Sequence, residues 1–134
     1  MKKLVLTLAA VLAGLTIFTA EAKRPAHAGN PNHSISIAEA APAFGDTVAV
    51  VFSTTEDEPW AHIACFREAI DINGEVVLAM VLEGYDYLGD GSAAFTLGPT
   101  PSWSGGGADC VVELGRNPGS RFHVLARYSF AVSP

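Results

Sequence analysis

Short runs in which apolar and polar residues alternate recur along the chain after residue 33. No apolar repeat of helical period continues for ten residues or more. Alternation is typical of strands with one buried face, and glycine, proline and asparagine between the runs mark turns. The pattern predicts seven strands, at residues 34–37, 47–54, 60–70, 75–82, 93–97, 109–114 and 121–132.

Three of these runs carry further detail. Both faces of residues 60–70 are partly apolar, so this strand belongs in the middle of a sheet. Asn73-Gly74 follows it and favours a tight hairpin into the next strand. In the last strand, alternate residues from Phe122 to Phe130 share one face. Seven short strands without a covering helix predict an all-β antiparallel β-sandwich, with a small closed barrel as the alternative.

The order of these signals resembles an immunoglobulin-like domain of the bacterial and phage type, over residues 34–132. The resemblance is carried by residues 41–48, 59–60, 65–66, 95–100, 102–103, 107–110, 124–126 and 129–132. It implies an immunoglobulin-like sandwich of about seven strands. In exported bacterial and phage proteins, similar domains mostly act as adhesive or display modules. Such folds host many functions, so the fold alone does not name one.

The chain departs from antibody domains around its cysteines. Antibody domains carry a tyrosine two residues before the second cysteine, where this chain has Ala108. Cys65 falls on the third predicted strand, not on the second. A bridge to Cys110 would therefore join the third and sixth strands, as neighbours within one sheet.

The N-terminus has the features of a secretory signal peptide. Lys2 and Lys3 precede an uncharged apolar run, and Ala20 and Ala22 provide the small residues of a cleavage site. The run is about 16 residues, short of the roughly 20 that a spanning helix needs. We therefore expect a signal peptide at 1–22, a flexible leader at 23–33 and the sandwich domain at 34–134. A second possible cleavage site would start the chain at Gly29.

Export places the protein outside the cytoplasm, secreted or periplasmic, with no stable membrane anchor after cleavage. Cys65 and Cys110 are the only cysteines, and an oxidising compartment favours a disulfide between them. The formal net charge is −6. Removing residues 1–22 takes away two lysines and one glutamate, which makes the charge −7. A nucleic-acid partner is therefore not expected.

The sequence gives no support for catalysis or a cofactor. It has no Gly-x-Ser-x-Gly motif, and no base is identifiable near the Gly-rich segment 102–107. The histidines His27, His33, His62 and His123 lack zinc-site spacing. Residues 71–75 resemble half a calcium loop, but the hairpin turn explains them first. We expect no enzyme activity and no metal site.

Aromatic residues supply the candidate binding contacts. Tyr85 and Tyr87, in the segment after the fourth predicted strand, face one way if that segment is extended. Together with Trp103 they form a candidate sugar-stacking strip, although packing at the edge of the core would explain the same residues. We expect a secreted, non-catalytic binding or adhesion module for a cell-surface glycan or protein. The sequence does not predict the ligand's identity or the oligomeric state.

Two alternatives come from other functional classes. The first is a periplasmic copper-binding protein that uses His27 and His33 near its mature N-terminus, because imidazoles and an amine suit Cu(II). Cleavage before Gly29 would remove His27 and weaken this alternative. The second is a structural accessory subunit of a surface assembly. An exposed apolar edge strand would favour it.

Overall fold

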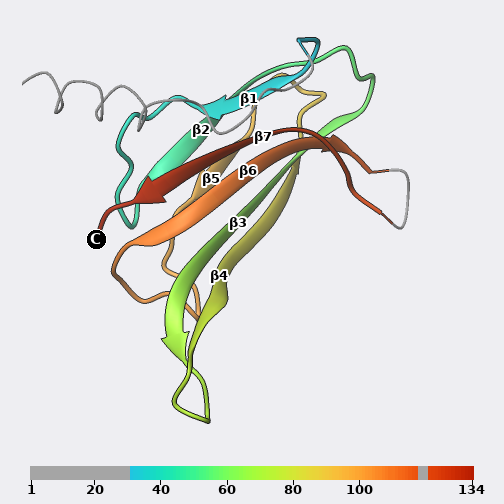
Figure 1. Cartoon of the computed structure of the whole chain (residues 1–134). Helices are drawn as coiled ribbons and strands as arrows, with labels where there is room; N and C mark the ends of the chain where they lie inside the picture. The colour runs from blue at the N-terminus through green and yellow to red at the C-terminus, as the bar shows by residue number, and fades with distance from the viewer. Residues whose placement is uncertain (1–30, 118–120) are drawn as a thin grey trace, which may run out of the picture.

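The structure is a computed structural model that describes residues 31–117 and 121–134 (Figure 1). The predicted signal peptide and most of the predicted leader lie outside these residues. The described residues form strands and no helix. The strands are β1 (Ser34–Ile37), β2 (Thr47–Ser53), β3 (Pro59–Ile70), β4 (Val76–Tyr87), β5 (Ala94–Thr96), β6 (Ala108–Arg116) and β7 (His123–Val132).

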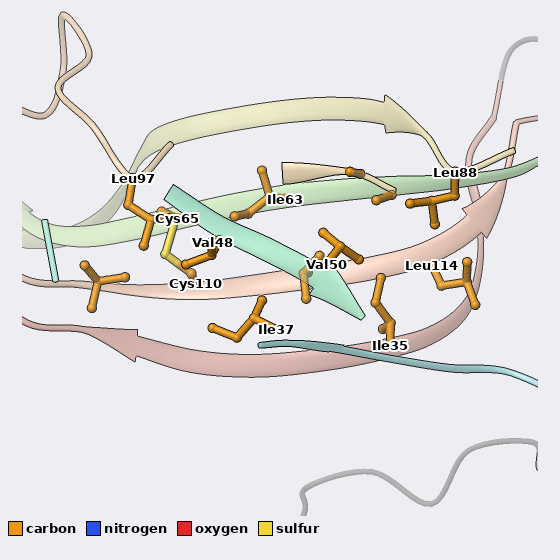
Figure 2. Close-up of a cluster of buried hydrophobic side chains, with 14 of the residues drawn as sticks. Ile35, Ile37, Val48, Val50, Ile63, Cys65, Leu88, Leu97, Cys110 and Leu114 are labelled. Carbon is orange, nitrogen blue, oxygen red and sulfur yellow. A yellow bond between two sulfur atoms is a disulfide. The ribbon is translucent and has the colours of Figure 1, made fainter. Parts of the chain in front are cut away.

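The strands form two antiparallel sheets. The smaller sheet has the order β1-β2-β5, and the larger has the order β4-β3-β6-β7. The sheets face each other across a layer of apolar side chains (Figure 2). The prediction of an all-β antiparallel sandwich of seven strands is therefore confirmed. The prediction that residues 60–70 form a central strand is also confirmed, since β3 lies between β4 and β6.

Alternation along the strands builds the core. On β2, Val48 and Val50 are buried while the residues between and beside them are exposed. On the facing sheet, Ile63, Val112 and Leu114 have no exposed surface. Each such side chain contributes about 1.5–3 kcal/mol by leaving water. The core therefore fixes which face of each strand points inward, and it leaves the other face available for a site.

A disulfide joins Cys65 to Cys110. The two residues are direct partners in the pairing of β3 with β6. The bridge thus lies within the larger sheet, as the position of Cys65 on the third strand predicted. It does not link the two facing sheets.

β4 is longer than its sequence suggested, since it continues through Gly84 to Tyr87. Gly84 pairs with Ile63, and a Cβ on Gly84 would meet the ring of Phe95 at 3.4 Å. A Cβ at this position would make ordinary van der Waals contact, so Gly84 lies inside a strand and does not end it. As a result, Tyr85 lies on a strand and not in a loop.

Two β-bulges shift the alternation within the larger sheet. One lies between Cys65 and Phe66, and the other between Leu114 and Gly115. A bulge adds one residue to one strand and so reverses which face the following residues occupy. On β7 the extra residue is Leu125, because Leu114 pairs with Ala126 while Gly115 pairs with Val124. The expectation that alternate residues from 122 to 130 share one face is therefore wrong.

β3 and β4 extend beyond the sandwich as a two-stranded hairpin, the green and yellow arm of Figure 1. The predicted turn is present, but it is looser than a two-residue turn. Gly74 has a φ of 81°, and no residue other than glycine has a positive φ among those described. The Asp71 carboxylate accepts hydrogen bonds from the main-chain N–H groups of Asn73 and Glu75 and holds the loop closed.

Candidate functional site

A row of ionic side chains crosses the outer face of the larger sheet, the face turned away from the smaller sheet. His62 on β3 lies at its centre. Its Nε2 is 2.9 Å from Glu83 Oε2 on β4, and its Nδ1 is 3.0 Å from Glu113 Oε1 on β6. Arg127 on β7 extends the row, with its Nη2 3.1 Å from Glu113 Oε2. One ionic network therefore connects all four strands.

The network fixes the orientation of the His62 ring. Each ring nitrogen lies within hydrogen-bond distance of a different carboxylate, one on each neighbouring strand. The side chains of His62 and Glu113 are 12% and 14% exposed, whereas that of Glu83 is 46% exposed. The Glu83 carboxylate is therefore the member of the pair that a ligand can reach.

Aromatic rings surround His62 on the same face. The Tyr85 ring lies 4.5 Å from the His62 ring at 31°, and the Phe122 ring lies 5.7 Å from both. Next to them, Trp60 and Tyr87 have ring centroids 5.3 Å apart. We call these five residues the aromatic patch. Tyr85 is 51% exposed, so about half of this residue is open to solvent.

Phe122 reaches the patch because of the second bulge and a glycine. A Cβ on Gly115 would meet the Phe122 ring at 2.5 Å and would also collide with the backbone carbonyl of His123. Only glycine leaves room for the ring at this point. Sequence reasoning missed Phe122 as a site residue, since the bulge that moves it to this face has no clear signal in the sequence.

The structure separates the three aromatic residues of the predicted strip. Tyr85 and Tyr87 lie on the outer face, as direct partners of His62 and Trp60. Trp103 has 0% of its surface exposed. Its Nε1 donates to the carbonyl of Gly106 at 3.0 Å, and its ring packs edge-on against Phe44 at 5.2 Å. Trp103 is therefore a core residue, which corrects its assignment as a binding contact.

The missed members of the site have a partial signal in the sequence. Trp60 and His62 alternate on one face of the third strand, which was noted as partly apolar. The carboxylates of Glu83 and Glu113 join them only through strand pairing. Pairing across 21 and 51 residues is invisible to local patterns.

Beside the ionic row, the outer face forms a shallow hollow of about 470 Å³. Its lining is formed by apolar and polar residues of β3, β6 and β7, which are Phe66, Asp109, Cys110, Val111, Ser129, Phe130 and Ala131. Val111 neighbours Glu113 on β6, so the hollow continues the same face. A ligand on the aromatic patch could therefore extend along the sheet.

The candidate metal ligands Asp71 and His33 are engaged in other hydrogen bonds. Asp71 already uses one carboxylate oxygen for two hydrogen bonds within the hairpin turn. His33 places its Nδ1 2.9 Å from the hydroxyl of Thr54, and His27 lies outside the described residues. Within residues 31–117 and 121–134, no group of three or more His, Cys, Asp or Glu side chains is arranged to hold a metal ion.

In the described part of the chain, no helix has the length and apolar character needed to cross a membrane. Comparison of the chain with protein-family models, with curated proteins and with solved structures finds no match. The site must therefore be interpreted from its own chemistry.

Proposed function

We propose that the protein is a secreted, non-catalytic binding module that holds a cell-surface glycan on its aromatic patch. The observation that carries this proposal is the exposed ring of Tyr85, which is stacked on a histidine fixed by two carboxylates. A sugar offers a flat face of C–H groups to such a ring. Its hydroxyl groups donate to carboxylate oxygens such as those of Glu83.

Rigidity supports this assignment. His62, Tyr85 and Glu83 project from the middle of paired strands, and their contacts with one another restrict their rotamers. Ordering side chains on binding costs about 0.5–1.5 kcal/mol each, so a patch that is ordered beforehand avoids much of this loss. The disulfide adds support for a location outside the cytoplasm, because such bonds persist in oxidising compartments.

We also propose that the sandwich is immunoglobulin-like. The order β1-β2-β5 in one sheet and β3-β6-β7 in the other agrees with strands A, B, E and C, F, G of that fold. β4 lies beside β3, where variable-type domains add further strands. This arrangement supports the resemblance that the sequence suggested.

A pelleting assay tests the binding proposal. The purified protein is mixed with cell walls and with insoluble polysaccharides, at low and high salt. We expect retention that resists salt, because stacking and hydrogen bonds carry the contact. Tyr85→Ala should weaken retention about tenfold or more, as truncation of a central aromatic contact does.

Tyr128→Ala is the matched control. Tyr128 is also an exposed tyrosine, but it stacks on Phe130 at β7 and has no contact with the aromatic patch among its ring contacts. We expect this variant to be retained like the unchanged protein. Absence of retention for the unchanged protein, or an equal loss in both variants, would contradict glycan binding at the patch.

A second candidate function is that of a structural subunit in a surface assembly. It is favoured by the exposed apolar residues Val76, Leu78 and Met80 on β4, the edge strand of the larger sheet. An apolar strand edge of this kind is a common site of contact between proteins.

A further inference from the structure

The hairpin arm beyond the sandwich carries an unusual amount of exposed apolar surface. Ile72 at its tip is 99% exposed, and Leu78 near its middle is 69% exposed. The exposed apolar residues of the arm are Ile70, Ile72, Val76, Val77, Leu78 and Met80. Contiguous apolar surface of this kind on a soluble protein marks an interaction site.

Hydrogen bonding defines which backbone groups of β4 are available. The N–H of Asp71 donates to the carbonyl of Glu75, so these two residues form a hydrogen-bonded pair. Such pairs alternate with non-hydrogen-bonded pairs along an antiparallel ladder. Val76, Leu78 and Met80 therefore form non-hydrogen-bonded pairs with their partners on β3. The N–H and C=O groups of these three residues point away from β3.

The available edge has clear limits. β4 is an outer strand of its sheet, so in the described part of the chain no strand pairs with its far side. At Val81, the hydroxyl of Thr100 donates to the main-chain carbonyl at 2.7 Å and covers the edge. At the other end the turn begins at Glu75. The available edge is therefore Val76–Met80, and Leu78 is its centre.

This edge lacks the features that normally protect an edge strand. Natural sheets use charged residues, proline or a bulge to prevent pairing with another strand. Val76–Met80 contains no charge and no proline, and the bulge at Val81 lies beyond it. An edge without such protection favours the addition of a strand.

We propose that the added strand is β4 of a second copy of the chain, paired antiparallel around a two-fold axis at Leu78. Leu78 then faces Leu78 of the second copy, and Val76 faces Met80 of the second copy. All three residues present their backbone groups outward, so each pair is hydrogen-bonded. Both sides of every pair are apolar, as a self-complementary interface requires.

Charge separates two registers in which a second copy could pair with this edge. A register centred on Ala79 would place Glu75 opposite Glu83 of the second copy, and like charges directly opposite each other destabilise a sheet. The register centred on Leu78 places Glu75 opposite the apolar Val81. The hydrogen-bonding positions of the edge are also symmetric about Leu78, so one strand supplies both halves of the contact.

The paired copies would form one eight-stranded sheet. An antiparallel pair related by a two-fold axis keeps the same face of each sheet on the same side. The two aromatic patches would therefore point the same way, and Tyr85 lies outside the paired stretch. Two sites on one face allow avidity for a polymeric or surface ligand. The inference itself rests on β4 alone and holds whether or not the patch binds a glycan.

Cysteine cross-linking tests the axis. In a hydrogen-bonded antiparallel pair the Cα atoms are about 5.5 Å apart, which suits a disulfide. Mild oxidation of the purified Leu78→Cys protein should therefore give a covalent dimer, with the Cys65–Cys110 bridge intact by mass spectrometry. Val51→Cys on β2 is the matched control, since Val51 is an exposed apolar strand residue in the other sheet. It should cross-link at least tenfold more slowly.

A mixture of two variants tests the register. Val76→Cys and Met80→Cys should cross-link with each other at least tenfold faster than either cross-links with itself. Equal rates in all three combinations would overturn the proposed register. No preference for Leu78→Cys over Val51→Cys would overturn the axis.

Sedimentation of the unchanged protein tests the association itself. The paired edge is short, so we expect a weak dimer that forms reversibly as concentration rises. Leu78→Lys should abolish it, because two lysines would meet at the axis, while Val51→Lys should not. A protein that stays monomeric at all concentrations and shows no selective cross-link would overturn self-pairing and leave the edge to a strand of a different protein. Glycan retention by the Leu78→Lys monomer distinguishes this failure from failure at the aromatic patch.

Discussion

The β3–β4 ladder has two halves of similar apolar character and opposite exposure. Within the sandwich, Ala61 and Ile63 have no exposed surface. In the hairpin arm, Ile70 and Leu78 are about two-thirds exposed, at 66% and 69%. The strands themselves do not differ in apolar content enough to explain this. What differs is the face and its cover: Ala61 and Ile63 point toward the smaller sheet, whereas Ile70 and Leu78 lie on the outer face of the larger sheet.

The lengths of the strands explain why the inner face of the arm is also left without cover. β3 and β4 have 12 residues each, whereas the longest strand of the smaller sheet, β2, has 7. At about 3.3 Å per residue, the longer strands span roughly 40 Å and the covering strand roughly 23 Å. The smaller sheet therefore does not extend over the inner face of the hairpin arm, where Val77 is 39% exposed. Ile70 and Leu78 lie on the outer face, which the smaller sheet does not cover, so they stay in solvent unless another chain covers them.

The disulfide strengthens the covered half, and its loss should have the largest effect. Cys65→Ala combined with Cys110→Ala opens a loop of 45 residues. The chain-entropy model gives a loss of about 4 kcal/mol in the free energy of unfolding. Urea denaturation of both proteins at low concentration measures it. A loss under about 1 kcal/mol would mean that the covered half does not depend on the bridge.

Ile63→Ala tests the packing of the covered half. Ile63 is fully buried between the sheets, and removing its side chain leaves a cavity. We expect the free energy of unfolding to fall by about 3 kcal/mol, within the usual 2–5 kcal/mol for this change. Urea denaturation again measures it, with an unchanged dependence on denaturant concentration. An effect below about 1 kcal/mol would remove the contrast between the two halves.

Much of the covered half could be predicted from the sequence. Alternation located all seven strands, and the place of Cys65 on the third strand predicted a bridge within one sheet. Both results follow from local geometry, because a residue's face depends on its position in a strand. The Asn73-Gly74 pair likewise predicted the hairpin turn.

The candidate site was harder to predict, because it depends on contacts between residues of different strands. The pattern ended the fourth strand at residue 82, yet Gly84 pairs with Ile63 inside β4. A bulge moved Phe122 to the outer face, and packing against Phe44 placed Trp103 in the core. Local patterns contain none of this information, since strand pairing, a neighbouring ring or an extra residue at a bulge decides where each side chain lies.

Leu78→Ala in the hairpin arm should have the smallest effect on the monomer. Leu78 is mostly exposed, so its truncation leaves no cavity, and we expect a change within about 0.5 kcal/mol in the free energy of unfolding at low protein concentration. At high concentration the outcome should differ. Pairing of native copies stabilises the unchanged protein by mass action, so its apparent stability should rise with concentration. Leu78→Ala should flatten this rise, and thermal unfolding over a concentration series measures both slopes. A loss of several kcal/mol at low concentration would show that the arm is packed within one chain, and the contrast between the two halves of the ladder would then be false.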